Sequence, residues 1–278
     1  MKLLPEEKLR AIFSELEGDG GLYVSIPETG ETLAIGEHNR YNAASTIKIP
    51  ILALLLKDGE EGRLNLDAPV PIHPENVVRG SGILKSLGTG VSMSLRDYAV
   101  LMIIISDNSA TNMVIDAVGI DRANAFFLEN GWNDTHLAAK IFFPLPTLPD
   151  GTRDLDKTSA ADLGKMIEQL LAGSLVSESV SRQMLQIMAA QQGGKLTRDL
   201  PILRCPNPTM ELPEIPEDKL LMPSKGGSIT NKSRHDAAVM LLPNGRKAAI
   251  GVMTATTDNQ KAGDILARVA VTVYEALR

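Results

Sequence analysis

Ser45 and Lys48 form the first pair of residues in this sequence that could do chemistry together. They stand three positions apart in "STIK", at the start of an apolar run. Residues three apart on a helix share a face, so the hydroxyl and the amine can meet. A serine hydroxyl becomes a strong nucleophile when a base removes its proton. A lysine can be that base if burial or a nearby positive charge keeps it partly neutral. Alone, this spacing is common by chance and also fits an ordinary helix face.

Two further strings carry residue types that could complete such a site. "SDN" at 106–108 follows the apolar segment "AVLMIII", where a polar triplet also marks an ordinary helix end. "KGGS" at 225–228 enters a predicted strand, and glycines on an edge strand let a ligand's backbone approach closely. Each string is weak evidence by itself. In this order, the three correspond to the S-x-x-K, S-D-N and K-T-G signature.

With these motifs the sequence resembles the serine β-lactamase-like family of class A β-lactamases and penicillin-binding proteins. The resemblance covers nearly the whole chain, and the strings around "SDN" and after "KGGS" strengthen it. It implies that Ser45 is the acylated nucleophile and that Lys48 activates it. Ser106 would pass a proton to the leaving nitrogen, and Lys225 would orient Ser106 and attract a substrate carboxylate.

The resemblance also assigns the residues that hold the substrate. The backbone N–H groups of Ser45 and Ser228 would form the oxyanion hole, which stabilises the tetrahedral intermediate. Asn108 would hydrogen-bond the amide side chain of the substrate, and Gly227 would allow its close approach. Arg234 would bind the substrate carboxylate, although a surface ion pair is an open alternative. Asp107 is expected to be structural, its carboxylate holding loop backbone.

One residue of the family pattern is missing. Class A β-lactamases carry a glutamate, in an E-x-x-L-N string, that activates the water for deacylation. Here no glutamate lies between Glu129 and Glu168, and "KIF" at 140–142 stands near the expected place. An apolar or positive side chain cannot deprotonate water as a carboxylate does. We therefore expect slow deacylation, with a trapped acyl-enzyme as one outcome.

Other outcomes stay open at this point. Lys48 or a loop aspartate could assist the water, or the acyl substrate could be a peptide or small ester. The loop aspartates Asp150, Asp154 and Asp156 are better interpreted as turn and capping residues. A second departure is Gly226, where the family has Thr or Ser. Ser224 or Ser228 could supply the missing hydroxyl.

The elements that must position these residues are predicted as strands near both chain ends with helices between them. Strands flank the turn "PETGE", a helix covers 46–57, and helices follow Ser94, cover 109–119 and open with Ser159. A strand, a hairpin around "PNG" and a final helix end the chain. Residues 141–158, rich in proline, are predicted to be irregular.

This pattern predicts an α/β fold of the α+β type. A mostly antiparallel sheet from both chain ends, flanked by terminal helices, would form a discontinuous domain of residues 1–44 and 189–278. Residues 45–188 would form an all-helical domain that carries the nucleophile and the "SDN" loop. Together this is the serine β-lactamase/transpeptidase-like fold.

Composition excludes several other classes of function. The 278 residues carry a formal charge of −6, which gives no general attraction for nucleic acid or anionic membranes. The lone Cys205 cannot form an internal disulfide, and the four histidines lack paired metal-ligand spacing. We expect no metal, no cofactor and a monomer. No stretch reaches the roughly 18 apolar residues of a membrane span.

The N-terminus lacks a signal-peptide pattern. The chain would therefore be cytoplasmic if it is full-length, and periplasmic or secreted if an export signal was trimmed. The sequence predicts a serine hydrolase that acts on a small-molecule acyl substrate, a cyclic amide (β-lactam) or an ester, through acyl-Ser45. The alternatives are a penicillin-binding or sensor-type protein and a D-alanyl-D-alanine peptidase-like enzyme.

Overall fold

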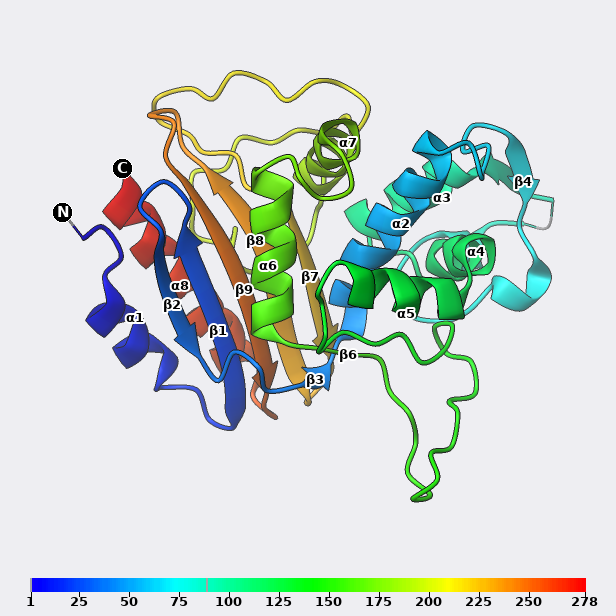
Figure 1. The fold of residues 1–278 in the computed structure, drawn as a ribbon, viewed down its shortest axis with the longest axis horizontal. Helices are drawn as coiled ribbons and strands as arrows, with labels where there is room; N and C mark the ends of the chain where they lie inside the picture. Colours follow the sequence, from blue (N-terminus) through cyan, green and yellow to red (C-terminus); the bar gives the residue numbers. More distant parts are fainter. Residues whose placement is uncertain (1, 89) are drawn as a thin grey trace.

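A five-stranded sheet forms one side of the molecule, and a group of helices forms the other (Figure 1). The computed structural model describes residues 2–88 and 90–278. The sheet order is β2-β1-β9-β8-β7, and every neighbouring pair is antiparallel. Its strands are β1 (Asp19–Ile26), β2 (Glu31–Ile35), β7 (Ser224–Ile229), β8 (Ser233–Leu241) and β9 (Lys247–Ala255). The predicted pairing of the two chain ends in one antiparallel sheet is confirmed.

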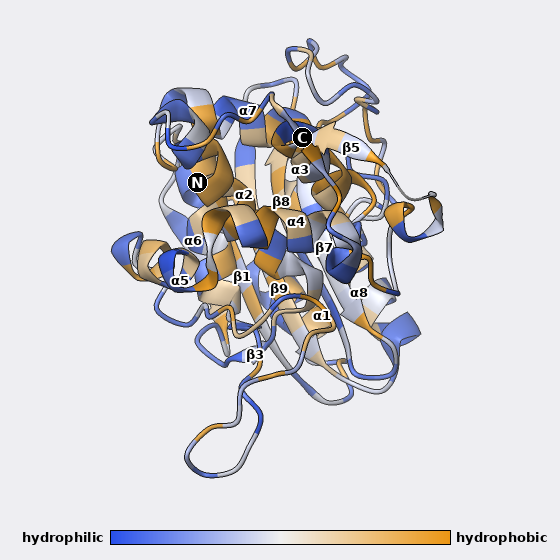
Figure 2. Ribbon diagram, turned by 90° about the vertical axis from the view of Figure 1, so that its right-hand side faces the viewer, coloured by the Kyte–Doolittle hydropathy of each residue, from blue (hydrophilic) through white to orange (hydrophobic). Residues whose placement is uncertain are grey.

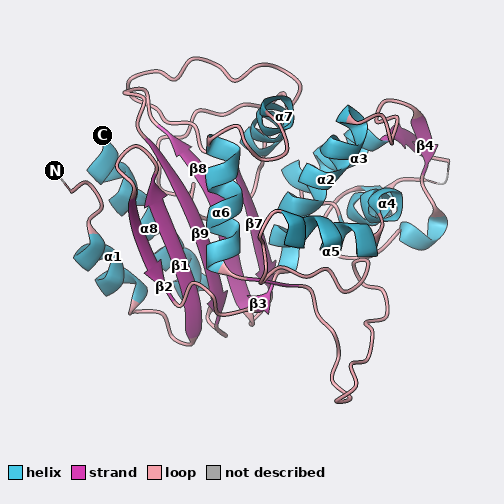
Figure 3. Ribbon diagram, in the orientation of Figure 1, coloured by secondary structure: helices cyan, strands magenta, loops and turns pink. Residues whose placement is uncertain are grey.

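Helices cover both faces of this sheet (Figure 3). Alternate residues of a strand point to opposite faces, and both rows of the central strands are apolar. Leu22 and Val252 pack with the terminal helices α1 (Glu6–Phe13) and α8 (Asn259–Leu277) in one apolar cluster. Ala249 and Met253 belong to the other cluster, which includes helix α6 (Ala160–Leu171).

The remaining helices gather beside the sheet around α2 (Lys48–Glu60), ten of whose residues are buried. They are α3 (Leu95–Ile104), α4 (Asn108–Val118), α5 (Ile120–Glu129) and α7 (Glu178–Ala189). Figure 2 shows hydrophobic residues concentrated along these helices and the strands, with hydrophilic residues along the outer loops. A helix that is buried on all sides is apolar all round, as "IPILALLL" is.

Short elements link these helices and strands. They are the two-residue strands β3 (Tyr41–Asn42) and β6 (Lys157–Thr158), the pair β4 (Pro69–Pro71) and β5 (Ser92–Ser94), and the 3₁₀ turns η1 (Ala44–Ile47), η2 (Pro74–Asn76) and η3 (Leu84–Ser86). The helix predicted over 46–57 begins only at Lys48, because η1 takes up the residues before it. Residues 141–158 were predicted to be irregular, and this is correct as far as Asp156, because Lys157 and Thr158 pair with β3.

The predicted helix starts follow from their caps. The Ser94 side chain accepts a hydrogen bond from the Asp97 N–H, and the Asp97 side chain accepts from the Ser94 N–H, which completes a capping box. Ser159 caps α6 with a single hydrogen bond, which its side chain accepts from the Asp162 N–H. The helix predicted over 109–119 starts one residue earlier, because Asp107 is its cap.

The boundaries of the two predicted domains stay a prediction. Helix α6 lies within the range 45–188 and packs on the sheet. Within residues 2–88 and 90–278, no helix combines the length and the apolar character that crossing a membrane requires.

Candidate active site

Ser45 lies in the 3₁₀ turn η1, between strand β3 and helix α2, and Lys48 is the first residue of that helix. The residue before the serine, Ala44, has φ +46°, in the left-handed region. Edge strand β7 passes directly beside this backbone. A Cβ added to Gly227 would come within 2.9 Å of the Ser45 nitrogen and 3.0 Å of the Thr46 nitrogen. Glycine at position 227 is therefore required by the close approach of strand and nucleophile.

Lys48 is fully buried beneath the site. Its Nζ donates to the backbone oxygen of Ser106 (2.9 Å), to Ser106 Oγ (3.0 Å) and to Asn108 Oδ1 (3.0 Å). Burial, together with the positive charge of Lys225, holds the pKa of Lys48 well below 10.5. Ser45 and Lys48 lie one turn apart, but no hydrogen bond joins their side chains within the described chain. The hydrogen bonds of the Lys48 amine go instead to Ser106 and Asn108 of the "SDN" segment.

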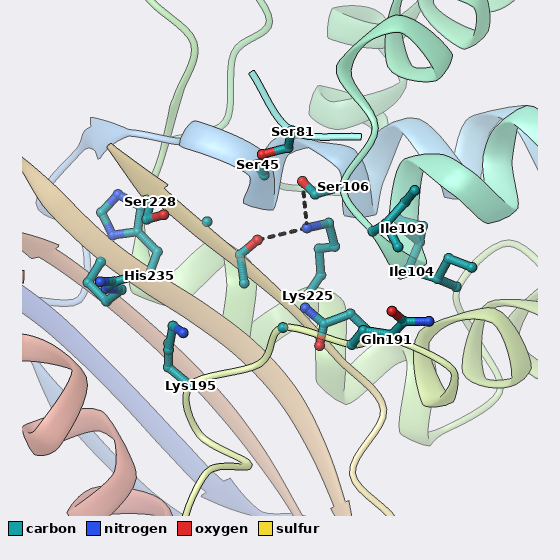
Figure 4. Close-up of a pocket in the computed structure, with 16 residues that line it drawn as sticks. Ser45, Ser81, Ile103, Ile104, Ser106, Gln191, Lys195, Lys225, Ser228 and His235 are labelled. Carbon is teal, nitrogen blue, oxygen red and sulfur yellow. Dashed lines mark hydrogen bonds between the residues drawn. The ribbon is translucent and has the colours of Figure 1, made fainter. Parts of the chain in front are cut away.

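Ser106 lies between two lysines, as Figure 4 shows for one of them. Lys225 Nζ donates to Ser106 Oγ at 3.1 Å and to the Gly226 carbonyl at 2.8 Å. Burial lowers the pKa of Lys225 to about 8. Ser106 also has a positive φ, +57°, a conformation that tertiary contacts must hold. Its hydroxyl is thus placed to exchange protons with either amine.

A pocket of about 330 Å³ opens in front of these groups (Figure 4). Among the predicted site residues, it is lined by Ser45, Ser106, Lys225, Gly227, Ser228 and Arg234. Lys48 and Asn108 do not line the pocket. Lys48 contacts the lining residue Ser106, and Asn108 contacts Lys48. Among the residues that the structure describes, three cations and no carboxylate line the pocket, so it favours an anionic ligand. The third cation is Lys195.

Sequence reasoning missed several lining residues. They are Ser81, Ile103, Ile104, Ile105, Gln191, Gln192, Gly193, Lys195 and His235. Most come from the loop before "SDN" or from the segment after α7, both remote from the motifs along the chain. Ile103–Ile105 adjoin "SDN" and His235 adjoins Arg234, so their neighbours are the sequence signal that could have found them.

Arg234 and Asn108 are held by backbone contacts. Arg234 Nε donates to the Asn259 carbonyl at 3.3 Å, and no carboxylate within the described residues forms an ion pair with this arginine. The Asn108 Nδ2 donates to the Arg79 carbonyl at 3.2 Å, while its Oδ1 accepts from Lys48. Arg234 therefore lines the pocket without a competing carboxylate partner.

Asp107 is structural, as expected. Its Oδ1 accepts from the Ala110 N–H (2.9 Å), and its Oδ2 accepts from the N–H groups of Ile83 (2.6 Å) and Leu84 (2.9 Å). The carboxylate thus caps α4 and ties the 81–87 loop to the segment that carries Ser106.

Ile141 belongs to the stretch 140–142, which stands near the place expected for the missing carboxylate. Asn112 holds Ile141 from both sides: its Nδ2 donates to the Ile141 carbonyl (3.1 Å), and its Oδ1 accepts from the Ile141 N–H (2.7 Å). Asn112 is one helical turn beyond Asn108, so Ile141 lies on the side of α4 that faces Lys48. Lys140 turns away to an ion pair with Asp116 at 2.8 Å.

The three loop aspartates serve the loop itself. Asp150 accepts from the N–H and the hydroxyl of Thr152, Asp154 lies 2.7 Å from His136, and Asp156 accepts from the Ala138 N–H. None of the three lines the pocket. Asp150 is the turn residue that the sequence predicted. For Asp154 and Asp156 the prediction is wrong, because their carboxylates contact His136 and Ala138, eighteen positions away.

Ser228 is the hydroxyl that can replace the one missing at Gly226. Ser228 is exposed and lines the pocket. The expectation that Ser224 could serve is wrong, because its buried hydroxyl donates to Gln191 Oε1 at 2.8 Å. On the neighbouring strand, the buried Asp236 Oδ1 has no hydrogen-bond partner among residues 2–88 and 90–278, and it lies 3.6 Å from where a Gly226 Cβ would stand.

Comparisons with known proteins agree with this arrangement. The model of the family described as "Beta-lactamase enzyme family" matches residues 4–277. The beta-lactamase CARB-3 of Pseudomonas aeruginosa is 29% identical over 199 residues, which cover 70% of this chain and 67% of the relative. A beta-lactamase structure from Sphaerobacter thermophilus superposes with a TM-score of 0.85 at 26% identity, covering 99% of this chain and 98% of that one.

A penicillin-binding relative is similar too. PBP-A superposes with a TM-score of 0.80 at 27% identity, covering 98% of this chain and 94% of that one. A leucine-to-glutamate mutant of PBP-A, solved as an acyl-enzyme complex with penicillin G, has a TM-score of 0.80 at 26% identity and covers 97% of this chain and 94% of its own.

Proposed function

This chain belongs to the beta-lactamase enzyme family, and on that ground we propose that it opens a β-lactam or a small ester through an acyl-Ser45 intermediate. The observation that supports this most is the meeting of two lysine amines at Ser106 Oγ, beside the pocket that Ser45 lines. Such a cluster supplies a base, a proton carrier and a positive charge around one hydroxyl nucleophile.

Acylation uses Lys48 as the base. Burial lowers the pKa of Lys48, which favours its neutral form, and in this proposal the neutral amine accepts the proton of Ser45. Ser45 Oγ attacks the carbonyl carbon, and the oxyanion that forms accepts hydrogen bonds from the N–H groups of Ser45 and Ser228. The C–N or C–O bond then breaks, Ser106 gives a proton to the leaving atom, and Lys48 returns a proton to Ser106 through their 3.0 Å contact.

Substrate binding uses the cations of the pocket. A carboxylate of the substrate lies near Lys225 and Arg234, because no acidic side chain competes along the pocket wall. The fork of an arginine binds a carboxylate with two parallel hydrogen bonds. In the free protein, Asn108 Oδ1 accepts a hydrogen bond from Lys48. We propose that Asn108 also hydrogen-bonds the amide of a bound substrate.

Deacylation is slow in this proposal. Ile141 has no group that could activate water, and no carboxylate lines the pocket.

Mass spectrometry after incubation with penicillin G tests the proposal. We expect a mass increase equal to one penicillin, located on Ser45, that persists for minutes to hours. The Ser45→Ala variant should fold normally and form no adduct. A lack of adduct with penicillin G, together with no turnover of nitrophenyl esters, would overturn the proposal.

The missing carboxylate can be tested separately with Ile141→Glu. A glutamate whose backbone Asn112 holds on both sides should position a water as general base, and such catalysis is worth about 10²-fold or more. The lifetime of the penicillin adduct should shorten by that factor. Ile141→Gln is the matched control, because it has the same shape without the basic oxygen. Equal adduct lifetimes in both variants would contradict this assignment.

A peptidase acting on D-alanyl-D-alanine ends is the second candidate. It shares the acylation site, and the cationic pocket would bind the terminal carboxylate of the peptide. Incubation with a diacetyl-lysyl-D-alanyl-D-alanine peptide discriminates the two, because a peptidase releases D-alanine with turnover, whereas a β-lactam-directed enzyme does not.

A further inference from the structure

His235 lies beside the proposed site without a role in the chemistry described above. It is on strand β8, fully buried, and it lines the pocket. Both ring nitrogens are hydrogen-bonded: the Thr254 N–H lies 3.0 Å from Nδ1, and Nε2 lies 2.9 Å from the Asn42 carbonyl. A backbone N–H can only donate, so Nδ1 is the acceptor. The proton is therefore on Nε2, which donates to Asn42.

Asn42 links His235 to the backbone next to the nucleophile. Its side-chain Oδ1 accepts from the Ala44 N–H at 2.9 Å. Ala44 has φ +46°, a conformation unfavourable for a residue with a Cβ. The next residue is Ser45. The strained backbone in front of the nucleophile is thus held by Asn42, and Asn42 is held by a ring buried in the sheet.

We call the hydrogen-bonded series His235–Asn42–Ala44 the tether. Its end in the sheet, His235, lies next to the strand that forms one wall of the proposed oxyanion hole. His235 is paired with Gly227 in the β7–β8 register, and Ser228 is paired with Arg234. A Cβ on Gly227 would lie 2.9 Å from the Ser45 nitrogen. The separation of the Ser45 and Ser228 N–H groups therefore depends on how closely η1 lies against β7.

We propose that His235 is a positioning residue, which through Asn42 holds the left-handed Ala44–Ser45 backbone against strand β7. Its effect on acylation rests on the proposed function, whereas its effect on the backbone does not. Loss of one oxyanion-hole donor slows acyl transfer by about 10²–10³-fold. A partial displacement of the Ser45 N–H should slow it by about 10–100-fold.

The variant His235→Leu tests the tether, because leucine fills the space without hydrogen bonds. Hydrogen exchange of the Ala44 amide, followed by NMR, should be at least tenfold faster than in the unmodified protein. Val239→Ala is the matched control: Val239 is fully buried on the same face of β8, away from Asn42. This control should leave Ala44 exchange unchanged. Unchanged Ala44 exchange in His235→Leu would overturn the proposal whether or not the protein reacts with penicillin.

Acylation kinetics give the second readout. With penicillin G, His235→Leu should lower the limiting acylation rate constant about 10–100-fold with little change in the non-covalent binding constant. His235→Gln, which can still donate to the Asn42 carbonyl, should retain most of the rate and serves if His235→Leu folds poorly. An equal loss in Val239→Ala would show general destabilisation and overturn the positioning role.

Ala44→Gly provides a rescue that only the tether predicts. Glycine adopts positive φ without steric cost, so the backbone needs less holding. Added to His235→Leu, it should recover about tenfold of the lost acylation rate. If the double variant is as slow as His235→Leu alone, His235 does not act through the Ala44 conformation.

Discussion

At the scale of single residues, the site depends on two lysines whose pKa values are lowered by burial. Lys48 and Lys225 are both fully enclosed, and their amines both contact Ser106 Oγ. Desolvation disfavours the charged form of each, so both pKa values fall. In the proposed mechanism Lys48 must be neutral to accept a proton, whereas Lys225 must be charged to attract a carboxylate.

The pH dependence of acylation follows from this difference. The pKa of Lys225 is lowered to about 8 from 10.5, so its positive charge is present below pH 8 and lost above it. The second-order rate constant for acylation by penicillin G should therefore fall as pH rises through about 8. Stopped-flow or quenched mass spectrometry between pH 6 and 10 measures this falling limb of the pH–rate profile.

Lys225→Arg separates this limb from other titrations. An arginine stays charged at every pH in the range, so the fall near pH 8 should disappear even if the absolute rate is lower. Persistence of the same limb in this variant would assign it to another group.

At the scale of elements, the end of α3 and the start of α4 are joined through one carboxylate. Asp107 caps α4 and holds two N–H groups of the 81–87 loop. Ser106, with its left-handed backbone, stands between these attachments. The conformation that presents its hydroxyl therefore depends on contacts that neither helix makes alone.

Asp107→Ala should lower the free energy of unfolding by about 3 kcal/mol, because it removes a cap and leaves buried N–H groups without partners. Urea unfolding followed by circular dichroism measures this. Asp97→Ala is the control, since Asp97 belongs to an exposed capping box and should cost only about 1 kcal/mol. Equal losses in the two variants would contradict the structural role of Asp107.

At the scale of the whole molecule, the packing of α6 against the sheet sets how closely the layers approach. Gly164 on α6 lies against the ring of Tyr23. On β9, a Cβ at Gly251 would come within 2.7 Å of the Ala160 carbonyl and 2.9 Å of the Gly164 nitrogen. Both of these atoms belong to the backbone, so they cannot move aside for an added Cβ as a flexible side chain could.

Gly251→Ala should therefore destabilise the protein by about 2–3 kcal/mol through overpacking. Gly263→Ala is the opposite control. It lies within α8 with no atom inside 4 Å of its added Cβ, so alanine should stabilise by about 0.5–1 kcal/mol. Thermal unfolding of both variants measures the difference, and a stabilising Gly251→Ala would contradict the close packing of these layers.

The sequence predicted those features that depend on neighbouring residues. The helix starts at Ser94 and Ser159 can be predicted locally, because in each a serine side chain bonds the N–H three residues on. The antiparallel sheet and most of the irregular segment 141–158 followed from local patterns of apolar residues, glycines and prolines, whereas strand β6 at its end did not. The three motifs indicated the family, and the family model confirms it.

Other features escaped the sequence because their partners are far apart along the chain. Lys48 contacts Ser106 and Asn108, about sixty positions away, and no spacing rule links them. Asn112 gave no signal that it would hold Ile141, nor did Ser224 show that Gln191 takes up its hydroxyl. The role of His235 depends on two partners from different elements, Thr254 and Asn42.

By itself the sequence determined which groups are available for chemistry: a serine, two lysines and a second serine, without the glutamate that would complete the family pattern. Only the tertiary structure decided their state. Burial of both lysines lowers their pKa values, and the sheet's edge brings Gly227 against Ser45. The reason is that side-chain type is local, whereas desolvation and the separation of groups depend on contacts between remote segments.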